Sequence, residues 1–141
     1  MSDSEFEHVT TEAAVAIYAS ATGAFSAVLN EIRELSKKKP DATMSSSKVK
    51  VINKVLDDLL VILKDEPEGK YLERLEDADL PQVSDALLTM VQYNPALDAF
   101  KKRYLRYVKI GYDRKHLWIT AERVAEWEAD DEDASEEEDD L

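Results

Sequence analysis

Hydrophobic residues recur every three or four positions through the first quarter of the chain, and this spacing predicts a long helix. Thr10 or Thr11 can cap it, and Glu12 then lies in its first turn, where a negative charge is favourable. The spacing is typical of the core face of a bundle helix. A dimerisation seam is the alternative, and Gly23 disfavours it because glycine weakens an isolated helix. The apolar stripe consists of Ala14, Tyr18, Ala21, Phe25, Val28, Ile32 and Leu35.

A second apolar segment predicts a central helix at about residues 48–64. Pro40 interrupts the polar linker at residues 36–47, and Ser46 or Ser47 can cap the helix that follows. Apolar residues fall on nearly every side of this segment, which is typical of a buried helix. Leu59–Leu63 could instead form a buried strand, but no second strand of comparable strength is evident in the sequence.

Shorter helices are expected over the rest of the chain. A turn at residues 66–69 precedes a short helix, Pro81 restarts a helix, and Asn94 caps another whose first residue is Pro95. That helix is expected to bury Leu97, Phe100, Tyr104 and Val108 and to stop at Gly111. Residues 112–120 are ambiguous between a strand and a loop, and Thr120 caps a last helix that ends near residue 128.

The expected fold class is therefore all-α, a compact bundle of five to six helices with a disordered acidic C-terminal tail. Its organisation would be a flexible N-terminus at residues 1–10, a helical domain at residues 11–128 and an acidic disordered tail at residues 129–141. The length of 141 residues suits one domain. Zero cysteines exclude a disulfide scaffold and thiol chemistry.

Charge is distributed unevenly along the chain. The formal net charge is −13, but eleven of the 31 acidic residues lie after residue 125 with no basic residue among them. This leaves 20 acidic against 18 basic residues in the body of the chain, a net charge of −2. Because like charges at such density repel and little apolar surface accompanies them, the tail is expected to be disordered.

A basic and aromatic segment precedes this tail. Residues 101–116 contain seven Lys and Arg against Asp113, a net charge of +6, with three tyrosines among them. The cations could contact phosphates while tyrosines stack on bases, or the same residue types could form a protein interface. Alternatively, Tyr104 and Tyr107 belong to the core and the cations are solvated. The candidate binding residues are Lys101, Lys102, Arg103, Tyr104, Arg106, Tyr107, Lys109, Tyr112, Arg114, Lys115, His116 and Trp118.

Few residues are arranged for catalysis. The chain has two histidines, His8 and His116, and no glycine-rich phosphate-binding motif. The tail lacks the ordered spacing and the glycine of a calcium-binding loop. We therefore expect no catalytic residues, no metal site, no cofactor and no enzymatic activity.

These observations favour a non-catalytic helical binding or regulatory protein that acts through protein–protein contacts, as an accessory or inhibitor of a nucleic-acid-handling assembly. The alternative is a nucleic-acid-binding protein that uses residues 101–116 and is modulated by its acidic tail. A third hypothesis, an acidic mimic of DNA, is weakened by the nearly neutral body. A basic or nucleic-acid-associated protein partner fits the tail, and a homodimer stays open.

The chain is expected to be intracellular, either cytoplasmic or nuclear, without a membrane partner. Its acidic N-terminus lacks the apolar region of a secretory signal, and no apolar run approaches the ~20 residues that span a bilayer.

Overall fold

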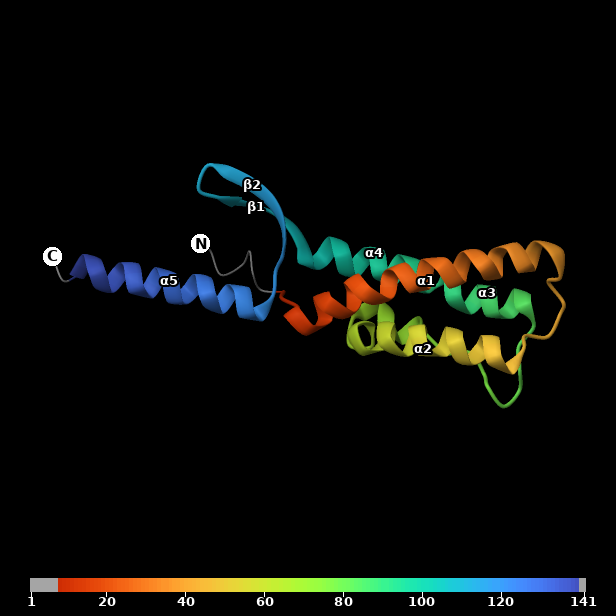
Figure 1. The fold of residues 1–141 in the computed structure, drawn as a ribbon. Helices are drawn as coiled ribbons and strands as arrows, with labels where there is room; N and C mark the ends of the chain where they lie inside the picture. Colours follow the sequence, from red (N-terminus) through yellow and green to blue (C-terminus); the bar gives the residue numbers. More distant parts are fainter. Residues whose placement is uncertain (1–7, 140–141) are drawn as a thin grey trace. The chain divides into compact units, whose positions relative to one another are not determined.

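The computed structural model describes residues 8–139, except for the side chains of residues 132–139. Most of the expected flexible N-terminus and the last two residues of the tail therefore lie outside the described residues. The fold is mostly helical and includes one small two-stranded sheet (Figure 1). The elements are α1 (Glu12–Lys38), α2 (Ser46–Leu63), the 3-10 helix η2 (Pro67–Tyr71), α3 (Val83–Val91), α4 (Tyr93–Tyr104), β1 (Leu105–Ile110), β2 (Asp113–Trp118) and α5 (Ala121–Asp139).

The chain divides into two compact units. The helical unit comprises Ala16–Phe100, and the terminal unit comprises Met1–Val15 together with Lys101–Leu141. The core of the helical unit contains Ala21, Phe25 and Ile32 of the predicted stripe of α1, together with Leu29, which was not part of it. The other residues of the stripe are only partly buried. The first long helix is thus confirmed, and it extends three residues beyond the predicted stripe, to Lys38.

Helix α2 confirms the second predicted helix but is less deeply buried than expected. Ser45 caps it, one residue before the predicted caps, and the Ser45 side chain accepts a hydrogen bond from the backbone N–H of Lys48. Leu56 and Leu59 are fully buried, whereas Val51 and Val61 are 53% and 58% exposed. The expectation of a helix buried on all sides is therefore wrong, because one side of α2 faces solvent.

The segment after α2 is mainly extended rather than helical. Only η2 forms there, and at Gly69 a Cβ atom would collide with the backbone oxygen of Leu63, so glycine is needed for this close approach. Buried Asn53 then holds the extended chain, because its Nδ2 donates to the Leu75 carbonyl at 3.0 Å and its Oδ1 accepts from the Leu75 N–H at 2.9 Å.

Helices α3 and α4 form close to the predicted positions with different first residues. Helix α3 begins at Val83, two residues after Pro81. Helix α4 begins at Tyr93, so Asn94 and Pro95 lie in its first turn, where proline is tolerated, and Asn94 is not the cap. Buried Tyr93 joins this helix to the extended segment, because its hydroxyl donates to the Glu73 carbonyl at 2.7 Å.

The predicted helix from Pro95 to Gly111 is wrong in its second half. Helix α4 ends at Tyr104, and the chain continues directly into β1, which pairs with β2 in an antiparallel hairpin. Gly111 has a φ of +62°, and Gly111-Tyr112 forms the two-residue connection, an arrangement that favours glycine at its first position. The all-α bundle of five to six helices is therefore incorrect.

Helix α5 begins as predicted after Thr120, whose Oγ1 accepts the backbone N–H of Arg123 at 3.1 Å. It continues to Asp139 and so includes most of the residues expected to form the acidic tail. Acidic residues three and four positions apart repel on a helix, and this repulsion disfavours the last turns of α5. Nothing tests the disorder expected from residue 129, so it stays a prediction.

In the described part of the chain, one helix, α1, is long and apolar enough to cross a membrane. The sequence of α1 contains no long run of consecutive apolar residues, because serine and threonine interrupt the apolar positions. The core helix of a soluble protein can have the same length and composition. The absence of a membrane partner stays a prediction.

Candidate functional site: a basic and aromatic hairpin

The hairpin register sorts the predicted binding residues onto two faces. Residues that pair directly across an antiparallel hairpin share a face, and faces alternate along each strand. The pairs Leu105–Trp118, Tyr107–His116 and Lys109–Arg114 therefore form one face, which we call the aromatic face. The pairs Arg106–Leu117, Val108–Lys115 and Ile110–Asp113 form the opposite face, which we call the mixed face.

The aromatic face presents rings and cations to solvent. The Tyr107 and His116 ring centroids are 4.8 Å apart with an angle of 42° between the ring planes, and 59% of Tyr107 is exposed. Lys109 and Arg114 are also exposed and pair directly opposite each other at the next position of this face. Two exposed aromatic rings thus lie beside two exposed cations.

The mixed face shares a hollow with the first half of α5. Val108 and Ile110 line this hollow of about 350 Å³ together with Lys109, and Trp127, Asp130 and Asp131 line it from α5. The apolar lining comes from Val108, Ile110 and Trp127. Lys109 and the two aspartates place opposite charges around the same space.

The base of the hairpin is held by backbone hydrogen bonds. The Ile119 N–H donates to the Tyr104 carbonyl at 2.7 Å, and the Thr10 N–H donates to the Ile119 carbonyl at 3.0 Å. Arg123 of α5 adds a bond from its Nη1 to the Trp118 carbonyl at 3.3 Å. These bonds hold the first residues of the hairpin in place. Figure 1 shows the hairpin following α4.

The other predicted binding residues lie around this face in different settings. Tyr104 is buried and belongs to the core, which was one of the alternatives for both tyrosines. Tyr107 is exposed and does not belong to the core. Arg103 lies over the Tyr104 ring, with its Cζ 5.9 Å from the centroid, and Trp118 is half-buried at the hairpin base. Tyr112 is fully exposed at the tip. The remaining candidates are exposed: Lys101 and Lys102 at the end of α4, and Arg106 and Lys115 on the mixed face.

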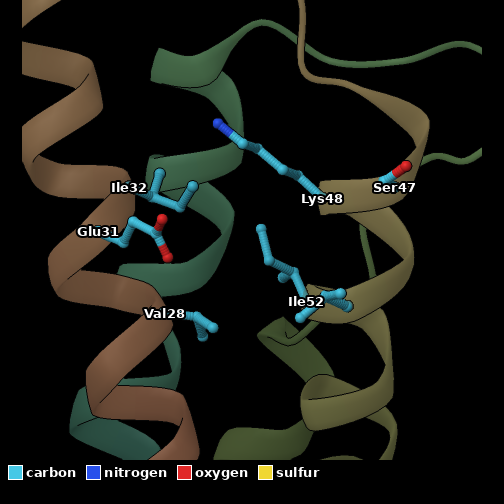
Figure 2. Close-up of a pocket in the computed structure, with 7 residues that line it drawn as sticks. Val28, Glu31, Ile32, Ser47, Lys48 and Ile52 are labelled. Carbon is cyan, nitrogen blue, oxygen red and sulfur yellow. The ribbon is translucent and has the colours of Figure 1, made fainter.

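A groove in the helical unit was not identified from the sequence. It has a volume of about 200 Å³ and lies between α1 and α2 (Figure 2). Val28 and Ile32 of α1 appear as core positions in the predicted stripe, but nothing in the pattern indicates that they face an open space. The lining residues are Val28, Glu31, Ile32, Ser47, Lys48, Val51 and Ile52.

No group of three or more His, Asp or Glu side chains suited to a metal ion occurs in the part of the chain that the structure describes. The His116 ring contacts that of Tyr107 at a tilt, and His8 is exposed. Two described tyrosines have shifted pKa values. Burial raises the pKa of Tyr18 and of Tyr93, and nearby carboxylates add to both shifts. Both tyrosines belong to the helical unit, outside the hairpin.

Comparison of the chain with protein-family models, with curated proteins and with solved structures found no match.

Proposed function

We propose that this chain is a non-catalytic binding protein that acts on a nucleic-acid-handling assembly and contacts a polyanion through its β1–β2 hairpin. The observation that carries the proposal is the exposed aromatic face, on which Lys109 and Arg114 lie next to the contacting, mutually tilted rings of Tyr107 and His116.

The charge around the hairpin supports a polyanionic partner. Residues 101–116 carry a net charge of +6, and Arg106 and Lys115 add exposed cations on the mixed face. Lysine and arginine bind nucleic acids mainly by neutralising phosphates, with release of counterions. The helix end that precedes the hairpin extends this field, since Lys101 and Lys102 are exposed there.

Fluorescence anisotropy with labelled single- and double-stranded DNA and RNA at two salt concentrations tests the proposal. The double variant Lys109→Gln/Arg114→Gln should weaken binding and reduce its salt dependence, by about 0.7 in the log–log slope for each lost contact with a single strand. The variant Lys38→Gln/Lys39→Gln is the matched control, because it removes the same charge from exposed positions outside the hairpin. Equal losses in both variants would contradict a hairpin site.

The acidic tail is proposed to compete with the polyanion for the hairpin. Asp130 and Asp131 line the same hollow as Lys109, so acidic side chains already lie near one of the cations. Deleting residues 129–141 should raise affinity for DNA or RNA at low salt, where charge interactions are least screened. Unchanged affinity at low salt would exclude this competition.

A protein partner in the α1–α2 groove is the second candidate. Figure 2 shows Val28, Glu31 and Ile32 on one side of the groove and Lys48 and Ile52 on the other. An apolar side chain of a partner would fit between them, with Glu31 and Lys48 available for polar contacts at the edge.

Two valines of α2 provide a matched test of the groove. Val51 lines it and is 53% exposed, while Val61 is 58% exposed on the same helix and does not line it. In cross-linking from the source cell, Val51→Asp should lose a captured partner that Val61→Asp retains. Retention by both variants would exclude the groove as the contact.

A further inference from the structure

We infer that the partner of the aromatic face is a single-stranded nucleic acid, with one base stacked on Tyr107 and the neighbouring phosphates held by Lys109 and Arg114. This inference rests on the proposed function and specifies the chemical class of the polyanion.

Tyr107 is suited to stacking because it is exposed and already supported. Its ring lies against His116 with 4.8 Å between centroids, yet 59% of the residue remains accessible. A ring that is held by a neighbour has less conformational freedom to lose when a base packs on it. Exposed aromatic rings on a sheet are a recurrent platform for the bases of single strands.

The cations lie at a suitable distance along the strands. Alternate residues of one face are separated by about 6.6 Å along a strand, so the Lys109–Arg114 pair lies one step from the Tyr107–His116 pair. The third pair of the face, Leu105–Trp118, lies one step in the opposite direction. A single strand of nucleic acid that lies along this face would therefore contact an aromatic pair of side chains and then a cationic pair.

A duplex fits this arrangement less well. Bases inside a duplex are stacked on one another and offer only their edges in the grooves. The flat surface of an exposed tyrosine has no base face to pack against unless the base is unpaired. The arrangement of rings and cations thus favours single-stranded DNA or RNA over double-stranded forms.

Anisotropy of the full chain with a labelled 15-nucleotide oligothymidylate and with an abasic oligonucleotide of the same length separates stacking from charge. The two probes carry the same phosphates, and only the first has bases. The wild-type chain should bind oligothymidylate more tightly than the abasic probe. Tyr107→Leu should reduce affinity for oligothymidylate about tenfold and bring the two probes close together.

Two further variants keep this test independent of folding. Tyr107→Phe retains the ring and should bind oligothymidylate as the wild type does, while Tyr112→Leu removes the exposed tip tyrosine and should have a smaller effect than Tyr107→Leu. Thermal unfolding should be similar for all three variants. Equal wild-type affinity for the two probes would overturn base stacking and leave polyanion binding intact. No binding to either probe at low salt would overturn both.

Discussion

The backbone N–H of Glu12 donates a 2.6 Å hydrogen bond to Oε2 of Glu122, 110 residues later in the chain. In return, the Oε1 of Glu12 accepts a 2.8 Å bond from the hydroxyl of Thr120, the residue that caps α5. The Thr10 carbonyl also accepts the N–H of Ala121 at 2.8 Å. The first turns of α1 and α5 therefore satisfy each other's free backbone donors, and two carboxylates lie where the helix dipoles favour negative charge.

Replacing Thr120 with valine should destabilise the protein by about 1–2 kcal/mol. Valine keeps the shape of threonine but removes the hydroxyl that accepts the Arg123 N–H and donates to Glu12. Thr120 is fully buried, so water cannot replace these bonds. Chemical denaturation measures the change, and Thr120→Ser, which keeps the hydroxyl, is the control. Equal stability of the valine and serine variants would show that these bonds contribute nothing.

Asn53→Ala should cost about 2–3 kcal/mol of unfolding free energy, because the N–H and the carbonyl of Leu75 would both lose their partner in the core. Asn53→Leu should be no better, since it fills the space but satisfies neither group. Lys54→Ala, at the next and exposed position of α2, should change stability by less than about 0.5 kcal/mol. Urea denaturation of the three variants makes the comparison. A leucine variant as stable as the wild type would exclude this anchoring role.

Tyr93 should make the protein sensitive to alkaline pH. Burial first, and then the carboxylates of Asp57 and Glu73, raise the pKa of Tyr93 well above its usual value, while Arg74 acts in the opposite direction. The pKa of tyrosine in the unfolded chain is about 10. The pKa of Tyr93 is higher in the folded state than in the unfolded chain. The contribution of neutral Tyr93 to the free energy of unfolding is therefore fully present below about pH 10 and is lost as pH rises towards the folded pKa.

The variant Tyr93→Phe isolates this effect. At neutral pH it should lose about 1 kcal/mol, because the hydrogen bond to the Glu73 carbonyl disappears. Above pH 10 its stability should fall less steeply than that of the wild type, although Tyr18, whose pKa is also raised, leaves a residual slope. Denaturation curves collected between pH 7 and pH 11 test both parts. Parallel pH profiles for the two proteins would contradict the assignment to Tyr93.

The sequence predicted the long helices well because their periodic apolar residues are the ones that become buried. Phe25 and Ile32 of α1 and Leu56 and Leu59 of α2 occupy the core. The exposure of Val51 and Val61 could not be predicted, because it depends on which elements pack against α2. Similarly, Leu72 and Leu75 are buried although they lie in a segment without an α-helix. There, the side chain of Asn53, from another part of the chain, bonds the backbone groups of Leu75.

The candidate site was predicted by residue type but not by geometry. The candidate residues before Gly111 were assigned to one helix, and those after it were left between a strand and a loop. However, β-branched and aromatic residues on both sides of Gly111 favour strands. The Gly-X connection between two such segments is a hairpin signal that was available in the sequence. Because Gly111 was interpreted as a helix end, the pairing of Tyr107 with His116 was not predicted. The stacking proposal depends on this pairing.

Gly111 should therefore control the candidate site through the hairpin turn. Apart from the adjacent residues of the chain, no described residue lies within 4 Å of a Cβ built at this position. A larger residue therefore meets no obstruction, and the cost comes from the positive φ of +62°. Gly111→Val should destabilise the hairpin by more than 1 kcal/mol, whereas Gly111→Asn should cost less because asparagine tolerates this conformation.

Amide hydrogen exchange should show faster exchange in residues 105–118 of the valine variant, with α2 unchanged. Affinity for oligothymidylate should fall in the same order, with valine weaker than asparagine and asparagine weaker than glycine. A valine variant with normal exchange and normal affinity would show that the turn does not organise the aromatic face.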